Sequence, residues 1–275
     1  MRHAVSIAAR IVTDSNAMLP AELAARFDIL EVSLTIVVDG QARSEHDIDL
    51  SEFYDQLRGG KPISTSAPSP GDVLAVYEQA VAAGAESLIS VHVGSNQSAT
   101  ISAVRIAAGQ VAVPVTIVDT GTASFIEGCC VWRAAEVLAT GAECADAASA
   151  AAAVAREAKS VFTIGEIARA NDGGRLAVRD GPGVPVYLSS GPDMRELDRV
   201  ISEAEAVAVM TAQVAAHAGP LRVGIGHADA PGAASVLERS LRSLPNVEET
   251  IRYVVGPSVA AHTGAGTFGA VFHPI

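Results

Sequence analysis

Two segments of the sequence carry clustered hydroxyl side chains whose types and spacing suit the binding of an anion. They read Ser-Thr-Ser at 64–66 and Ser-Asn-Gln-Ser-Ala-Thr at 95–100. The second lies inside residues 88–108, where an apolar strand pattern ends at Gly94 and a helical pattern follows. Hydroxyl oxygens at such a turn can cap the helix, and the helix dipole with free N–H groups favours an anion there. We predict carboxylate binding, with a simple helix cap as the alternative.

A third candidate segment lies late in the sequence, where His262 and Thr263 precede a glycine-rich run. Residues 264–269 match G-x-G-x-x-G, but a dinucleotide site needs a following helix and strand, and only residues 270–275 remain. We interpret the run as a close backbone approach with the histidine and threonine as donors; a glycine turn beside a structural histidine is the alternative. The candidate ligand-binding residues are therefore Thr65, Ser66, Ser95, Ser98, Thr100, His262, Thr263 and Gly264.

Other residue types that could perform chemistry form no recognisable catalytic or metal-binding motif. The sequence has no G-x-S-x-G nucleophile motif, and its histidines lack metal-ligand spacing, the nearest cluster being His-Ala-Asp at 227–229. Cys129, Cys130 and Cys144 make a poor disulfide framework, so we predict reduced, buried thiols. Asp119 ends an apolar strand, and we favour a cap of the next helix over a catalytic role. We predict neither a metal nor a cofactor.

The composition favours a globular protein and excludes several classes of partner. The 275 residues are 49% hydrophobic and 4% aromatic, an ordinary profile for an α/β protein. A formal net charge of −12 repels phosphate backbones and anionic membrane surfaces, so we expect no nucleic-acid partner. No apolar run approaches the roughly 20 residues that span a bilayer, and residues 1–10 lack the apolar core of a signal peptide. We expect a cytoplasmic protein without stable membrane insertion.

The hydrophobic periodicity predicts alternating strands and helices that could position these residues. Strands are predicted at 10–13, 29–38, 88–93, 115–119, 161–164, 184–188, 221–225, 247–255 and 270–272. Helices are predicted at 20–27, 52–57 with Ser51 as its cap, 72–83, 101–108, 124–138, 142–159, 194–216 and 231–244, and residues 61–71 are predicted to form a loop. The recurrence predicts an α/β fold with two domains, 1–159 and 160–275. The first would hold a parallel sheet with helices on both faces, and the second would be a smaller α/β domain.

Six short motifs extend this interpretation. They are Ile-Val-Thr-Asp-Ser at 11–15 with Leu19-Pro20, Ser-Thr-Ser-Ala-Pro-Ser at 64–69, the segment 95–100, Val-Asp-Thr at 118–120 with Ser124 and Gly128, Gly-Gly-Arg at 173–175 and His-Thr-Gly-Ala-Gly at 262–266. In this order and spacing they resemble the DegV family of bacterial fatty-acid-binding proteins, over nearly the whole chain. The sequence departs from the family pattern at Gln97, Ala99 and Ala265, where leucine, glycine and proline are usual. Residues 176–199 are shorter and less basic than the family's usual segment.

The resemblance implies that two α/β domains enclose one fatty acid in an apolar tunnel between them. It places the carboxylate on residues that correspond to Thr65, to Ser95 or Ser98, and to His262. It also implies that the protein performs no catalysis itself and, as in some relatives, presents the acid to a separate ATP-dependent fatty-acid kinase. Candidates for the tunnel wall are Phe27, Ile29, Phe125, Ile126 and Phe162, although for each residue alone we favour a place in the plain core.

Two other functions stay open on the sequence. One is a small acyl or phosphoryl transferase or hydrolase using Ser98 and His262, which would need an orienting acid such as Asp14 or Asp119. The other is a carrier of a different amphipathic acid, such as an isoprenoid or sterol acid. Burial of a methylene contributes roughly 0.8 kcal/mol, so a long acyl tail offers on the order of 10 kcal/mol before ordering costs. Since an unpaired buried carboxylate costs several kcal/mol, the tail should drive affinity while the hydroxyl groups offset the head-group penalty.

Overall fold

The first sheet of the molecule is entirely parallel. The computed structural model describes residues 9–172, 181–191 and 193–275. Sheet A has the strand order β2-β1-β6-β7, and each neighbouring pair runs parallel. Its strands are β1 (Ala9–Asp14), β2 (Leu30–Val32), β6 (Ser87–His92) and β7 (Val115–Asp119). The predicted parallel sheet of the N-terminal half is confirmed.

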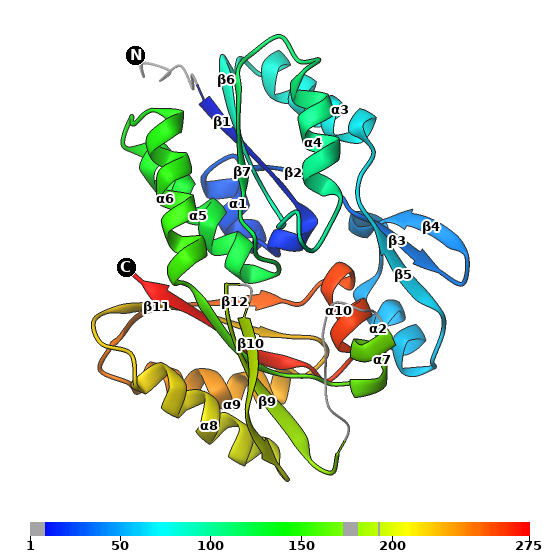
Figure 1. The fold of residues 1–275 in the computed structure, drawn as a ribbon, viewed down its shortest axis with the longest axis vertical. Helices are drawn as coiled ribbons and strands as arrows, with labels where there is room; N and C mark the ends of the chain where they lie inside the picture. Colours follow the sequence, from blue (N-terminus) through cyan, green and yellow to red (C-terminus); the bar gives the residue numbers. More distant parts are fainter. Residues whose placement is uncertain (1–8, 173–180, 192) are drawn as a thin grey trace.

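Helices cover both faces of sheet A (Figure 1). Because side chains alternate along a strand, Val12 joins the apolar cluster of Val104 on one face, while Ile11 joins that of Phe125 on the other. The first face is covered by α3 (Pro70–Ala82) and α4 (Thr100–Ala108), and the second by α5 (Phe125–Ala139) and α6 (Cys144–Glu157). The short helices η1 (Ser15–Ala17) and α1 (Ala21–Arg26) follow β1.

Side-chain caps determine where two helices of this half begin. Ser69 Oγ accepts the N–H of Asp72 at 3.2 Å, and the Asp72 carboxylate accepts the N–H of Ser69 at 3.0 Å, which is a reciprocal capping box before α3. Helix α2 (Leu50–Arg58) begins after Asp49, whose carboxylate accepts the N–H of Glu52 at 2.9 Å. The predicted cap at Ser51 is therefore wrong, because this residue lies inside the first turn.

A small antiparallel sheet, sheet B, projects from the N-terminal half. It consists of β3 (Thr35–Val38), β4 (Gln41–Ser44) and β5 (Ile63–Ser66), with β3 in the centre; η2 (Glu45–Asp47) follows β4. The predicted strand 29–38 is wrong as one unit, because the N–H of Leu34 donates to Ser15 Oγ at 2.9 Å and the chain leaves sheet A there. The predicted loop 61–71 contains β5, whose pairing with β3 depends on tertiary contact rather than on local composition.

The C-terminal half is built on a six-stranded mixed sheet, sheet C, with the order β10-β9-β8-β13-β11-β12. Only β11 and β12 are parallel neighbours in it; the other pairs are antiparallel. The strands are β8 (Lys159–Thr163), β9 (Val184–Ser190), β10 (Asp193–Val200), β11 (Leu221–His227), β12 (Val247–Val254) and β13 (Phe268–Pro274). The mixed α/β fold class is thus confirmed.

The helices of this half are α7 (Ile167–Asp172), α8 (Glu203–Ala215), α9 (Pro231–Arg242) and α10 (Pro257–Thr263). The predicted helix 194–216 is wrong in its first part, which forms β10. Two causes explain this: residues 193–200 alternate in burial as they pair with β9, and Ser202 caps α8 by accepting the N–H of Glu205 at 3.3 Å. The predicted motif at 173–175 lies outside the described residues.

The two faces of sheet C have different neighbours (Figure 1). Helices α8 and α9 cover one face, while the other turns toward α5 and α6. On that second face Phe125 of α5 stacks on Tyr253 of β12, with ring centroids 4.3 Å apart. A Cβ atom at Gly224 would come within 2.4 Å of the Phe125 ring, and one at Gly226 within 2.1 Å of the Tyr253 ring. Both rings therefore need glycine in β11.

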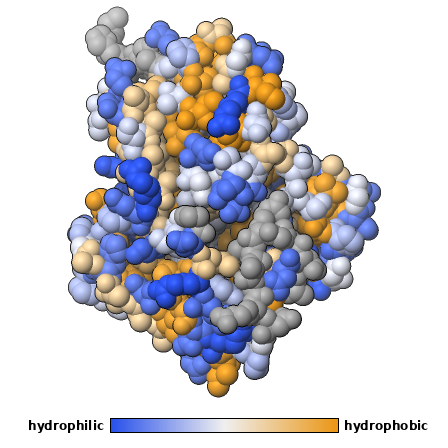
Figure 2. Space-filling model, viewed as in Figure 1, coloured by the Kyte–Doolittle hydropathy of each residue, from blue (hydrophilic) through white to orange (hydrophobic). Residues whose placement is uncertain are grey.

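One apolar cluster joins the two halves, since Ile89 of β6, Phe125 of α5 and Val271 of β13 belong to it. Sheet C begins at Lys159, but the domain boundary at that residue stays a prediction. No helix of the described part of the chain is both long and apolar enough to cross a membrane. Figure 2 shows apolar residues gathered around α4, where Ile106 is half exposed, with polar residues over much of the remaining face.

Candidate functional site

A cavity of about 670 Å³ lies between sheet C and the loops at the carboxyl ends of the sheet A strands. Open α/β sheets bind ligands at this edge, and the volume is that of a typical small-molecule site. Six of the predicted site residues line the cavity: Thr65, Ser66, Ser95, Ser98, His262 and Thr263. Thr100 and Gly264 do not belong to its lining. Sequence segments almost 200 residues apart are thus brought to one wall.

The contact between Thr65 and His262 defines the polar end of the cavity, which we call the head end. Thr65 Oγ1 lies 3.2 Å from His262 Nε2, within hydrogen-bond distance. Strand β5 carries the threonine and α10 the histidine, and these two elements pack together. Gly264 ends α10 with φ +82°, and a Cβ atom there would lie 2.5 Å from Glu166. Gly264 therefore shapes the helix end that holds His262.

The loop between β6 and α4 has a dense set of internal hydrogen bonds. The N–H groups of Gln97 and Ser98 donate to the carbonyl oxygen of Gly94 at 2.8 and 3.1 Å, and that of Ser95 donates to Asp119 Oδ1 at 3.0 Å. The prediction that these N–H groups are free for an anion is therefore wrong. A Cβ atom at Gly94 would lie 2.6 Å from the backbone of Gly121, so this loop packs tightly on the next one.

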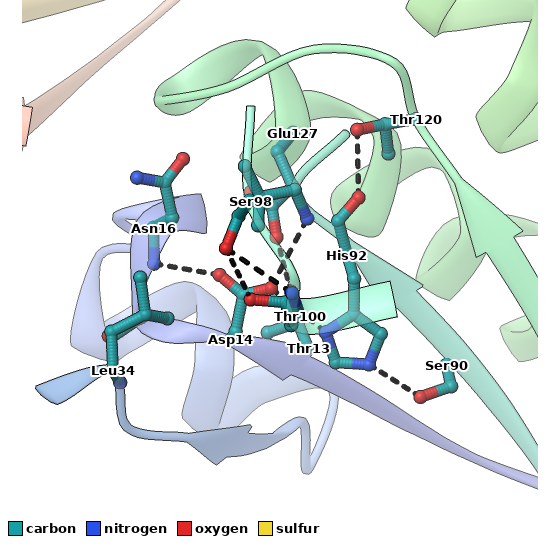
Figure 3. Close-up of polar contacts among 12 residues, drawn as sticks. Thr13, Asp14, Asn16, Leu34, Ser90, His92, Ser98, Thr100, Thr120 and Glu127 are labelled. Carbon is teal, nitrogen blue, oxygen red and sulfur yellow. Dashed lines mark hydrogen bonds and ion pairs between the residues drawn. The ribbon is translucent and has the colours of Figure 1, made fainter. Parts of the chain in front are cut away.

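Thr100 supports Ser98 from behind the cavity wall. The Thr100 side chain is fully buried, its Oγ1 lies 2.9 Å from Ser98 Oγ, and its N–H donates to the same oxygen at 3.3 Å (Figure 3). Where the Thr100 hydroxyl is the donor, Ser98 keeps its own proton for a ligand. Ser98 is thus hydrogen-bonded to Thr100, whereas His262 contacts Thr65.

Asp119 joins two loops at this edge of sheet A. One carboxylate oxygen accepts the N–H groups of Ser95 and Gly121, at 3.0 and 3.1 Å. The predicted cap of the next helix is wrong, because α5 begins after Ser124, which has no side-chain cap, and Asp119 bonds to the neighbouring loop instead. Burial acts to raise the pKa of Asp119, but the hydrogen bonds from Ser95 and Gly121 outweigh it and hold that pKa below its usual value.

Asn16 is a cavity-lining residue that sequence reasoning missed. Its Oδ1 accepts the N–H of Ser124 at 2.7 Å, and its Nδ2 donates to Ser258 Oγ at 3.4 Å. Ser124 has φ +61°, a conformation that is uncommon without glycine. The side-chain amide of Asn16 therefore joins the loop before α5 to the first turn of α10. The available signal was the position of Asn16, directly after the motif at 11–15 and the strand β1.

A buried polar chain fixes Asp14, the residue that orients this turn. Asp14 Oδ2 lies 2.9 Å from His92 Nδ1, and His92 Nε2 lies 2.6 Å from Ser90 Oγ (Figure 3). The Ser90 hydroxyl in turn lies 2.6 Å from the Tyr77 hydroxyl. The other Asp14 oxygen accepts the N–H of Asn16 at 3.0 Å. Nearby, burial together with the charge of Asp14 raises the pKa of Glu127 well above its usual value.

Glu45 fastens the first turn of α10 to the turn after β1. Its carboxylate accepts hydrogen bonds from the Ser15 hydroxyl and, at 2.6 Å, from the N–H of Ser258. A Cβ atom at Gly256 would lie 2.9 Å from Glu45 Oε1, so glycine permits this approach. Burial, only partly offset by the hydrogen bonds, raises the pKa of Glu45 to about 7. Sequence reasoning gave no role to this residue.

The rest of the cavity, which we call the far end, extends over the face of sheet C that turns toward α5. Its wall includes Phe162, Tyr253 and the glycines Gly226 and Gly269. Among the predicted tunnel residues Ile126 and Phe162 line the cavity, whereas Phe27, Ile29 and Phe125 do not. No lysine or arginine belongs to the lining formed by the described residues. The cavity is thus polar and uncharged at the head end and mainly apolar beyond it.

Comparison with known proteins matches nearly the entire chain to one family. The model for uncharacterised proteins of the DegV family covers residues 8–274. A DegV domain-containing protein of Streptomyces coelicolor is 31% identical over 271 residues, which is 95% of this chain and 96% of that one. The chain belongs to the DegV family.

Solved structures of DegV proteins share the fold. A DegV family protein from Thermus thermophilus, described as binding fatty acid, superimposes with a TM-score of 0.89 at 25% identity, covering 97% of this chain and 99% of that one. A DegV lipid-binding protein from Thermotoga maritima gives a TM-score of 0.88 at 23% identity, over 96% and 98% of the two chains. The DegV resemblance of the sequence is therefore confirmed.

Proposed function

We propose that this protein binds one long-chain fatty acid, with its carboxylate at the head end of the cavity and its tail at the far end. The single observation that carries the proposal is the Thr65–His262 contact of 3.2 Å at the polar end of a 670 Å³ cavity whose other wall is apolar. The fatty-acid binding described for the Thermus thermophilus relative supports it.

The head group would be held by neutral donors and by one histidine. Thr65 Oγ1 and His262 Nε2 lie close enough to share one carboxylate, while Ser95 and Ser98 line the same wall. Hydrogen bonds to a charged group are stronger than those between neutral groups, contributing about 1.5–3 kcal/mol each. These bonds offset the loss of hydration, and burial of the tail supplies the affinity. Ser66 and Thr263 would complete the wall; Thr100 and Gly264 would support it from behind.

Mass spectrometry of the intact protein under non-denaturing conditions tests this proposal. Purified protein should carry a long-chain fatty acid, and the variant Thr65→Val combined with His262→Ala should lose most of it. Thr211→Val is a suitable control, because this half-buried hydroxyl lies on α8 and bonds to the carbonyl oxygen of Val207. Equal acid content in the double variant and the wild type would disprove the head-group assignment, and a different lipid in the wild type would favour another amphipathic acid.

We propose further that the bound acid is presented to a separate fatty-acid kinase, rather than transformed by this protein. Neutral donors suit a carboxylate that must later attack a phosphate, because pairing with arginine would reduce its nucleophilicity. The described contacts also favour binding over catalysis, since Ser98 bonds to Thr100 and not to His262. The test is a reconstitution with a fatty-acid kinase, ATP and loaded protein, in which acyl phosphate should form. Ester hydrolysis by the protein alone, abolished by Ser98→Ala, would contradict the proposal.

A further inference from the structure

The far end of the cavity contains a polar pair that the proposed head-group site does not use. Ser160 of β8 and Ser189 of β9 lie directly opposite each other in an antiparallel pair, and both line the cavity. Residues opposite each other in such a pair share a face of the sheet, with Cβ atoms about 5 Å apart. Within the described part of the chain, neither hydroxyl takes part in a hydrogen bond. The pair is therefore available to a ligand.

The cavity-lining neighbours of this pair offer no hydrogen bonds from their side chains. Met194 of β10 lies opposite Ser189 of β9. Nearer to α10, Phe162 of β8 and Gly269 of β13 lie opposite each other and also line the cavity. Two hydroxyl groups thus interrupt an apolar wall. A plain alkyl chain packed against them would leave both groups without partners, which is unfavourable. A chain with an oxygen at this depth would satisfy them.

The strand β8 gives the distance between the two polar sites. The N–H of Gly165 donates to the carbonyl oxygen of Thr263 at 3.0 Å, so this end of the segment lies beside α10 and His262. Ser160 precedes Gly165, which lies in the bend after β8, by five residues, so the two are at most about 16 Å apart at about 3.3 Å per residue. An extended alkyl chain advances about 1.3 Å per bond. The extended peptide backbone gives this value, because the three bonds between consecutive Cα atoms span about 3.8 Å. The serine pair therefore lies beside the middle of a bound acid, at the farthest beside about its twelfth carbon.

We propose that Ser160 and Ser189 form a second polar subsite, and that the preferred ligand is a long-chain fatty acid oxygenated near the middle of its chain. A hydroxyl group there can donate to one serine and accept from the other, and a keto oxygen can accept from both. The inference rests on the proposed function, because the position along the chain is counted from the carboxylate at His262.

Equilibrium binding of three acids to the delipidated protein tests this subsite. Stearate, 3-hydroxystearate and 12-hydroxystearate are compared on the wild type, on Ser160→Ala with Ser189→Ala, and on Ser190→Ala. We expect the wild type to bind 12-hydroxystearate about tenfold more tightly than stearate, equivalent to about 1.4 kcal/mol, with no advantage for 3-hydroxystearate. The double variant should lose this preference. Ser190→Ala should keep it, because Ser190 is outside the cavity lining and points to the other face of β9.

Two results would overturn the inference: equal wild-type affinity for stearate and 12-hydroxystearate, or a preference that survives in the double variant. Failure of all three acids to bind would contradict the proposed function instead, so the two failures are distinguishable. Each substitution removes one oxygen, and the melting temperature of each variant reports whether it folds. If the double variant does not fold, the single variants decide, since each should lose part of the preference and an unchanged preference in both overturns the subsite.

Discussion

The two ends of the cavity are built by opposite means. At the head end, hydrogen bonds hold lining groups in place: Asn16 accepts the N–H of Ser124 and donates to Ser258 Oγ. At the far end, glycine lets neighbouring atoms approach the wall closely: a Cβ atom at Gly226 would lie 2.1 Å from the Tyr253 ring, and one at Gly269 would lie 2.6 Å from Phe162 Cβ. The polar groups of the head end therefore depend on hydrogen bonds, while the shape of the far end depends on glycine and its proposed selectivity on Ser160 and Ser189. Substitutions at the two ends should fail in different ways.

The largest effect should come from adding a methyl group at the far end. In Gly226→Ala the new Cβ atom would lie 2.1 Å from the Tyr253 ring, which is buried and stacked on Phe125. We expect the free energy of unfolding to fall by about 3 kcal/mol, the upper part of the range for overpacked cores, as measured by urea denaturation. Gly232→Ala is the matched control, because nothing lies near its Cβ position and alanine favours the helix. Equal stability of both variants would contradict the steric account.

The next effect is on the pH dependence of folding stability, and it concerns Glu45, which supports the head end. The folded state raises the pKa of Glu45 from 4.5 to about 7, so the native protein binds more protons than the unfolded chain in this interval. The contribution of Glu45 to stability is therefore largest below pH 4.5 and is lost as pH rises through 7, a decrease of about 3 kcal/mol for this residue. Glu45→Gln should remove this part of the decrease in urea titrations at several pH values.

Two comparisons make the Glu45 measurement specific. Glu22→Gln changes an exposed carboxyl group on α1 and should leave the pH dependence unchanged. Glu127, whose pKa burial also raises, contributes a decrease in the same direction that persists in Glu45→Gln. A stability profile of Glu45→Gln that matches the wild type would show that Glu45 titrates normally.

A smaller effect, on ligand affinity rather than on stability, is expected at His262. Removal of the imidazole in His262→Ala deletes one charge-assisted hydrogen bond to the proposed carboxylate, worth about 2 kcal/mol. The dissociation constant for a fatty acid should therefore rise about thirtyfold in a fluorescent-acid displacement assay. His46→Ala, which removes an exposed histidine paired with Glu31, serves as the control. An unchanged affinity in His262→Ala would remove the histidine from the head-group site.

The smallest effect should come from Thr100, which acts through Ser98. Thr100→Val removes the hydroxyl 2.9 Å from Ser98 Oγ and should weaken fatty-acid binding about fivefold, or about 1 kcal/mol. A double-mutant cycle distinguishes this route from general damage. In a Ser98→Ala background, Thr100→Val should have little further effect. Fully additive losses would mean that the threonine acts independently of Ser98.

The fold was predictable where local pattern and tertiary pairing agree. The parallel sheet and its helices follow from apolar strands such as 88–93 and from the helical periodicity between them, as in 101–108. The errors occur where pairing overrides pattern. Residues 63–66 look like a loop and become β5 through contact with β3, and residues 193–200 look helical and become β10 through contact with β9.

The site was predictable from residue types but not from its supporting contacts. Clusters of hydroxyl residues identified the walls that contain Thr65 and Ser95, because both clusters stand beside apparent strand ends, where open α/β sheets hold ligands. Asn16 and Glu45 could not be identified, since their roles arise from contacts with Ser124 and Ser258, more than a hundred residues away. The far end was the part of the site least predictable from sequence. A glycine in a strand does not reveal which side chain will pack against it.

The stack of Phe125 on Tyr253 has a consequence for ligand exchange. These rings belong to opposite halves of the chain and both rest on the backbone of β11. A rigid hinge motion that swings the halves apart must unstack them and hydrate the shared interior, which is costly for aromatic groups of this size. Displacement of a short surface segment exposes far less. We therefore expect a ligand of the cavity to enter and leave by local displacement of the chain, and we expect the two halves to unfold together.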